Sequence, residues 1–173
     1  MAGAVNMVAF SGARRLNSSQ TARVAELAAA LTPAGAAVLV GCAPGVDAVV
    51  RARFPAAQVF AVASGKYGDG PPAYARRSAA MVRTLAAAGS GALLVAFPTR
   101  PCPSGVVPAS SWRSGRPPSG TWSTAALAVG LGCALVVAPL VSLTPPRWAN
   151  GTWQEEGALW RWEPAPSLQL PLF

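Results

Sequence analysis

The chain has 173 residues, of which 52% are hydrophobic and 12% charged; this composition predicts a globular domain with a real core and excludes a largely disordered chain. It contains no histidine and three scattered cysteines, which excludes Ser-His-Asp and Cys-His catalysis, histidine-based metal sites and a disulfide framework. The net charge of +8 is typical of proteins that bind nucleic acid or phosphorylated ligands, although a GC-rich genome would also supply the arginines.

Short apolar runs alternate with helical segments along the chain. Strands are predicted at Val5–Ser11, Ala37–Val40, Gln58–Val62, Ala92–Phe97 and Ala134–Ala138, and helices at about Ser19–Leu31, Val46–Arg53, Pro72–Ala88 and from Ser119 onwards. Asn17, Ser18 and Ser19 are N-cap candidates for the first helix. The alternation predicts an α/β fold with a doubly wound parallel sheet of about five strands.

Ala125–Leu143 carries no charge and is close to the length that spans a membrane. Gly130, Gly132 and Pro139 interrupt it, and a helix-like half precedes a β-branched half. A helix followed by a buried parallel strand explains this pattern better than a membrane span, because parallel strands are covered on both faces. We therefore expect no membrane partner, and a cytoplasmic protein, since no signal peptide is visible.

The character of the chain changes after the fifth predicted strand. Four tryptophans lie there among Pro, Gly and Glu residues: Trp148, Trp153, Trp160 and Trp162. We predict that residues 1–142 form the main domain, residues 143–163 a short Trp-rich appendage or β-hairpin, and residues 164–173 a flexible tail punctuated by proline.

Three glycine-containing turns follow predicted strands, within Phe10–Leu16, Val38–Ala48 and Pro118–Thr124. Each leads to a helix N-terminus, where unpaired N–H groups and the helix dipole favour an anion. Because ligands of such sheets bind beyond the carboxyl ends of the strands, we expect the three turns to meet there around a nucleotide-like ligand.

Five motifs occur in a fixed order between about Val5 and Ala138. They are Ser11–Arg14, Gly41–Asp47, Arg76–Ser78 with Met81–Val82, Phe97–Pro98 and Ser119–Thr121. Their order resembles the SLOG superfamily, a Rossmann-like group that includes the DNA-processing protein DprA and the cytokinin-activating LOG enzymes, and it is closest to the small stand-alone, YspA-like members. The resemblance implies a Rossmann-like fold and a possible nucleotide ligand, with no certain cofactor.

The candidate ligand- and phosphate-binding residues are Gly12, Arg14, Gly41, Gly45, Asp47, Arg77, Ser119, Gly120 and Thr121. The comparison with the superfamily places phosphate on Gly120-Thr121 with Arg14 and Arg77 nearby, and leaves Gly41–Asp47 to shape the cleft and meet a sugar. Ordinary helix capping is the alternative for Thr121 and Asp47, and solvated surface for the arginines. Tyr67 and Trp122 could stack on a base or pack in the core or its rim.

The LOG branch implies a nucleoside-monophosphate phosphoribohydrolase with a Gly-Gly-x-Gly-Thr-x-x-Glu loop and a helix-borne arginine. Arg77 and Gly120-Thr121 match this pattern, but Thr124 occupies the glutamate position. Without that carboxylate no obvious group stabilises an oxocarbenium-like centre or activates water. We therefore expect a binder rather than a catalyst, and assign no catalytic or metal-binding residue.

The chain ends in Gln169-Leu170-Pro171-Leu172-Phe173, which looks like the bacterial sliding-clamp-binding peptide. An extended, proline-flanked peptide loses little entropy when it binds, Leu172 and Phe173 can fill an apolar pocket, and Gln169 can hydrogen-bond at its edge. The motif implies the DNA polymerase sliding clamp as a partner. The alternative is an apolar tail that folds back on its own domain.

The leading hypothesis is a SLOG-like protein of DNA metabolism that binds a nucleotide or single-stranded nucleic acid and is recruited to the sliding clamp. The Arg-rich face and the long loop Pro98–Pro118 would hold the phosphates. The alternatives are a LOG-like phosphoribohydrolase and a nucleotide-signal sensor in phage defence whose effector is a separate chain. Apolar surface on the third and last helices leaves a homodimer as an option.

Overall fold

The computed structural model describes residues 3–112 and 119–166. The described part contains seven strands and four α-helices. In chain order these are β1 (Met7–Gly12), α1 (Ser18–Ala30), β2 (Ala37–Gly41), α2 (Val46–Arg53), β3 (Gln58–Phe60), α3 (Pro71–Ala86), β4 (Ala92–Phe97), α4 (Gly120–Gly130), β5 (Ala134–Val137), β6 (Gly151–Glu156) and β7 (Leu159–Pro164). All strands belong to one sheet, in the order β3-β2-β1-β4-β5-β7-β6.

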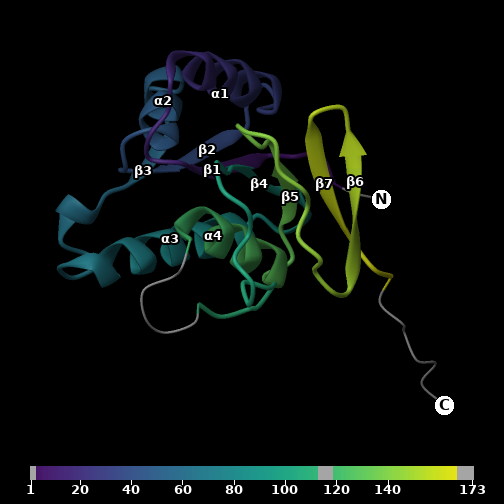
Figure 1. Cartoon of the computed structure of the whole chain (residues 1–173). Helices are drawn as coiled ribbons and strands as arrows, with labels where there is room; N and C mark the ends of the chain where they lie inside the picture. Colours follow the sequence, from purple (N-terminus) through teal and green to yellow (C-terminus); the bar gives the residue numbers. More distant parts are fainter. Residues whose placement is uncertain (1–2, 113–118, 167–173) are drawn as a thin grey trace.

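The first five strands form the predicted parallel sheet. Strand β1 pairs with β2 and β4, β2 with β3, and β4 with β5, each pair parallel. Helices α1 and α2 cover one face of the sheet, and α3 and α4 cover the other (Figure 1). This arrangement confirms the doubly wound, Rossmann-like α/β fold. The chain changes face between β1 and β4, which is where such sheets open a crevice at their carboxyl ends.

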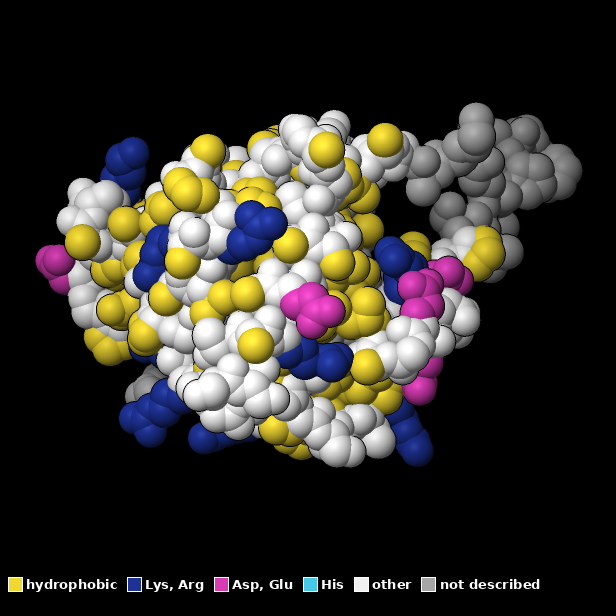
Figure 2. Space-filling model, turned by 90° about the horizontal axis from the view of Figure 1, so that it is seen from above, with side chains coloured by type: hydrophobic (Ala, Val, Ile, Leu, Met, Phe, Trp, Pro, Cys, Tyr) yellow, Lys and Arg dark blue, Asp and Glu magenta, His cyan; other side chains and the backbone are white. Residues whose placement is uncertain are grey.

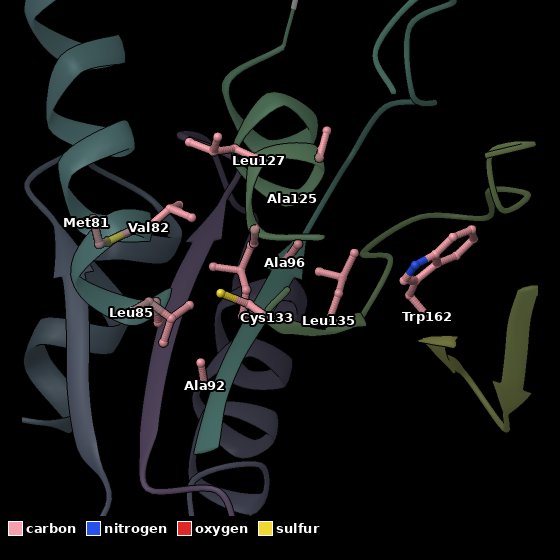
Figure 3. Packing of buried hydrophobic residues seen from close by; sticks show 14 of the residues in the cluster. Met81, Val82, Leu85, Ala92, Ala96, Ala125, Leu127, Cys133, Leu135 and Trp162 are labelled. Atoms are coloured by element: carbon pink, nitrogen blue, oxygen red, sulfur yellow. The ribbon is translucent and has the colours of Figure 1, made fainter. Parts of the chain in front are cut away.

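Each face of the sheet has its own apolar core. On the side of α1 and α2, Phe10 packs between Phe54 and Phe97, with ring centroids 6.1 and 6.4 Å apart. On the other side, side chains of α3 and α4 converge on strands β4 and β5 (Figure 3): Met81, Val82, Leu85, Ala125, Leu127, Ala96 and Leu135. Strand β4 is buried along its whole length, which explains its uniformly apolar sequence.

Local sequence sets the helix starts. Asn17 is the N-cap of α1, and its side chain and that of Gln20 bond each other's backbone N–H groups, at 2.8 and 3.0 Å. Such a reciprocal capping box satisfies two N–H groups that the helix itself leaves unpaired. Strand β3 ends earlier than predicted because residues Val62–Ser64 form a short 3₁₀ turn.

The tryptophan-rich segment folds as a hairpin, β6 and β7, but it continues the main sheet instead of standing apart from it. Strand β7 pairs antiparallel with β5, so the sheet has seven strands where about five were expected. Trp148, Trp160 and Trp162 are buried, and the ring centroids of Trp153 and Trp162 lie 5.1 Å apart. The hairpin covers an apolar strand edge that would otherwise be exposed.

The apolar stretch Ala125–Leu143 divides as predicted into the end of α4 and the strand β5, with Gly132 at positive φ between them. Within the described ranges, no helix combines the length and the apolar character that a bilayer crossing requires.

Candidate functional site

The first two glycine turns meet at the carboxyl ends of β1 and β4. The backbone N–H of Ala13 donates to the Phe97 carbonyl at 3.2 Å, and the Ala13 carbonyl accepts from the N–H of Val46 at 3.0 Å. Gly45 has a φ of +75°, and a Cβ there would overlap the backbone of Ala13 and Arg14. A glycine is therefore required where the start of α2 crosses the first turn.

The third turn lies beside the end of β4. A pocket of about 220 Å³ opens there between the loop after β4 and the start of α4. Pro98, Thr99 and Arg100 line it from the loop, with Pro101 and Pro103, while Ser119, Thr121 and Trp122 line it from the helix. Two of the three candidate residues at this turn therefore border a cavity, and Gly120 next to them is exposed.

Asp47 and Arg77 form an ion pair at the end of β2. An Arg77 Nη1 lies 3.4 Å from Asp47 Oδ2, and the two residues are 6% and 5% exposed. The N–H of Ala43 donates to the same carboxylate oxygen at 3.1 Å. A Cβ on Gly41 would overlap the Arg77 guanidinium. Gly41 is thus the residue that lets the arginine lie against the strand end.

The N-cap of α2 is Gly45, so Asp47 does not cap that helix, which was the alternative role for it. Burial raises the pKa of Asp47 above its usual 3.8, while Arg77, the N–H of Ala43, and the charges of Arg51 and Arg14 act in the opposite direction. Arg77 Nε is buried and has no hydrogen-bond partner among the described residues. The pair is therefore strongly desolvated and incompletely satisfied.

The start of α4 is capped by its own sequence. Ser119 is the N-cap, and its Oγ accepts the N–H of Trp122 at 3.3 Å. The hydroxyl of Thr124 is buried and donates to the Gly120 carbonyl at 2.7 Å. Thr124 stands where the LOG pattern has glutamate, and its hydroxyl is thus used in a hydrogen bond within the helix. Thr121 is half-buried and faces the pocket.

The two aromatic residues singled out for base stacking are packed in or against the core. Trp122 is 1% exposed, and its Nε1 donates to the Arg100 carbonyl at 2.8 Å. Tyr67 is half-buried against the core on the α3 side. Arg14 is exposed, and its guanidinium carbon lies 4.7 Å from the ring centroid of Tyr74. Of the core and stacking alternatives, the structure shows the core role for Trp122.

Three residues near these turns were not predicted as site residues from the sequence. Arg51 donates to the carbonyls of Gly41 and Ala43, at 2.8 and 3.1 Å, and so closes the second turn. Its spacing from Asp47, one helical turn along α2, was the available signal. Tyr74 lies one turn before Arg77, whereas Arg100 reaches the pocket from a loop that carries no periodic pattern.

Two of the three thiols, those of Cys102 and Cys133, favour their protonated form because they are buried. Burial raises the pKa of both Cys102 and Cys133 to about 11, and the Sγ of Cys42 accepts the N–H of Val62 at 3.4 Å. In the part of the chain that the structure describes, no three His, Cys, Asp or Glu side chains gather as metal ligands would. The clamp-motif residues Gln169, Leu170, Leu172 and Phe173 lie outside the described residues.

Comparison of the chain with protein-family models, with curated proteins and with solved structures finds no match.

Proposed function

We propose that the protein binds a nucleotide or single-stranded nucleic acid, as a SLOG-like protein of DNA metabolism. The buried Arg77–Asp47 pair against Gly41 is the observation that carries this proposal. Desolvation offsets most of the attraction within a buried ion pair, so such a pair is a weak reason for stability. Its place at the carboxyl ends of the strands, where ligands of these sheets bind, favours a role in ligand binding.

Two places at the carboxyl ends of the strands offer donors for phosphate: the arginines around Asp47, and a pocket at the start of α4 that neither Asp47 nor Arg77 lines. Arg14 and Arg51 add positive charge near Asp47, and the start of the 11-residue helix α4 borders the pocket that Arg100 also lines. N–H groups at a helix N-terminus and planar guanidinium groups are the donors that proteins use for phosphate. A phosphate on Ser119–Thr121 fits this arrangement.

A direct test measures the polarisation of a fluorescent oligothymidylate and of labelled nucleotides during titration with the whole protein. We expect binding that weakens at least several-fold in Arg100→Ala, because that variant removes the guanidinium at the pocket. Arg83→Ala is the matched control, since Arg83 is exposed and lies in the last turn of α3, which leads to the amino end of β4. A wild-type protein that binds neither probe at low salt would end the proposal.

The clamp link is a separate part of the proposal and has its own test. A labelled Leu168–Phe173 peptide is titrated with a bacterial sliding clamp, and we expect saturable binding that Phe173→Ala abolishes. The last two side chains would fill the apolar pocket, as aromatic and aliphatic anchors do in peptide recognition. Equal polarisation changes for the two peptides, or none for either, would remove the link to replication.

A LOG-like phosphoribohydrolase is the weaker candidate. The hydroxyl of Thr124 is engaged with the Gly120 carbonyl, and a hydroxyl does not supply the charge that an oxocarbenium-like centre needs. We expect no release of free base from a panel of nucleoside monophosphates. Base release that is lost in Arg77→Ala would reverse this ranking.

A further inference from the structure

The ring of Tyr74 differs from every other aromatic side chain that the structure describes. It is 40% exposed. Among the exposed large hydrophobic side chains of residues 3–112 and 119–166, it is the one aromatic ring. Arg14 lies over the ring, with its guanidinium carbon 4.7 Å from the centroid. A cation over an exposed ring contributes little to stability, so the pair has little structural purpose.

The backbone around the pair holds both side chains at the strand ends. Gly45 packs onto the backbone of Ala13 and Arg14, and the Val46 N–H binds the Ala13 carbonyl. Tyr74 lies in the first turns of α3, one turn before Arg77, and residues at that spacing share a helix face. Tyr74 therefore lies on the side of α3 from which Arg77 reaches Asp47.

The loop before α3 is fixed as well. Nη1 of Arg76 donates to the Tyr67 carbonyl at 3.0 Å, which ties the helix to the loop that precedes it. Arg14 with the open ring of Tyr74, and Arg77 one turn further along α3, thus lie at the carboxyl ends of the strands, where the first two glycine turns meet. Planar bases stack on aromatic rings and on guanidinium planes, and every base has a face that can do so.

We propose that Tyr74 and Arg14 form a stacking platform for a nucleobase, so that the site recognises its ligand through a base in addition to a phosphate. The ring surface that Arg14 leaves uncovered takes the base, and Arg14 remains close enough to meet the adjoining phosphate. This inference rests on the proposed nucleotide or single-strand binding. It adds recognition of the base, which a phosphate site alone does not contact.

The test compares two fluorescent strands of the same length, about 20 nucleotides. One is oligothymidylate, and the other has the same backbone without bases. We expect Tyr74→Ala to weaken oligothymidylate binding about ten-fold or more and to leave the abasic strand unchanged, whereas Tyr74→Phe keeps the ring and retains wild-type affinity. Val59→Ala, at an exposed apolar residue of β3, is the control.

The outcomes separate this inference from the function beneath it. The stacking platform would be overturned, and phosphate binding left in place, if the protein bound both strands with equal affinity. The same would follow if Tyr74→Ala bound oligothymidylate as tightly as the wild type does. If the protein bound neither strand nor thymidine monophosphate, both the stacking platform and the proposed function would be overturned. A preference for thymidine monophosphate over ribose 5-phosphate that Tyr74→Ala removes would support the platform in a mononucleotide site. Circular dichroism of each variant confirms its fold.

Discussion

At the scale of single residues, the Asp47–Arg77 pair is the most sensitive point of the molecule. Both residues are nearly inaccessible to water, and Nε of Arg77 has no hydrogen-bond partner in the part of the chain that the structure describes. We expect Asp47→Ala to lower the free energy of unfolding by about 3–5 kcal/mol, because it leaves a buried arginine without its counter-charge. Urea denaturation followed by circular dichroism measures the change.

The double variant Asp47→Leu with Arg77→Met is the companion measurement. It removes both charges and keeps apolar volume, so we expect it to be more stable than Asp47→Ala. A double variant that is as unstable as the single one would show that the site depends on its shape rather than on charge balance.

Gly41 gives a second residue-scale prediction. A Cβ there overlaps the Arg77 guanidinium, so Gly41→Ala should destabilise the protein and displace that side chain. In a double-mutant cycle with Arg77→Ala we expect a coupling energy of about 1 kcal/mol or more, since the two changes share one contact. Gly120→Ala is the control, because a Cβ there meets no atom of the described residues within 4 Å. Additive effects would contradict the contact.

The thiols predict a decline in stability at high pH. Folding raises the pKa of Cys102 and Cys133 from 9.0 to about 11, so the unfolded chain ionises first as the pH increases. Their contribution is fully present below pH 9.0 and is lost as the pH rises through 11. Thermal unfolding across this range should show a smaller decline in the double variant Cys102→Ala, Cys133→Ala. Parallel curves would contradict the shift.

The strand-to-helix turns that carry most of the candidate residues could be located from sequence, but the contacts of those residues could not. Gly12, Gly41 and Gly45 were predicted because each lies in a turn after an apolar run. The signal for such a strand-to-helix turn lies in residues that are neighbours in the sequence. The pairing of Arg77 with Asp47 joins two helices across a strand end, and no periodic pattern encodes such a distance. The burial of Trp122 and the exposure of Tyr74 depend likewise on which helix faces meet.

At the scale of elements, the hairpin is the part that sequence reasoning described least completely. Helix α2 and strand β4 have the predicted bounds, because caps and apolar runs are local signals. A hairpin was one of the two forms predicted for this segment, the other being an irregular appendage. Its pairing with β5 was not predicted, because an antiparallel partner can be any exposed strand edge.

The hairpin predicts a single cooperative unfolding transition. Trp162 is 5% exposed, pairs across the hairpin with Trp153 and faces Leu135 of β5. We expect Trp162→Ala to destabilise the whole protein by about 3–5 kcal/mol. Trp162→Phe should cost less, because the indole Nε1 has no hydrogen-bond partner among the described residues.

The measurement is denaturation followed by tryptophan fluorescence and by far-ultraviolet circular dichroism. Gln154→Ala, at an exposed residue of β6, should stay within about 0.5 kcal/mol of wild type. Two separate transitions would mean that the hairpin unfolds on its own and that its pairing with β5 adds little.

At the scale of the whole molecule, charge is unevenly distributed. Of the six acidic residues, Glu155, Glu156 and Glu163 lie in the hairpin, where Arg161 is the one basic residue. Figure 2, seen over the α1 and α2 layer, shows a cluster of acidic side chains on the hairpin side, further acidic side chains elsewhere on the face, and Lys and Arg scattered over the whole face. The basic excess therefore lies before the hairpin, in the helices and in the segments that connect them to the parallel strands.

This distribution predicts strong salt dependence of nucleic-acid binding. The logarithm of the affinity for oligothymidylate should fall linearly with the logarithm of salt concentration, by about 0.7 per phosphate contact. Arg14→Ala should reduce the slope by about that amount, and Arg83→Ala should leave it unchanged. Polarisation titrations at four or more salt concentrations measure the slopes. A salt-independent affinity would contradict phosphate contact.

The late position of β6 and β7 in the chain has a consequence during protein synthesis. Strand β5 leaves the ribosome before its antiparallel partner exists, so one row of its backbone groups waits unpaired for roughly one to five seconds. The hairpin then closes within microseconds and seals the edge. A chain truncated after β5 would keep that strand edge unpaired permanently, and we expect it to depend on chaperones or to aggregate.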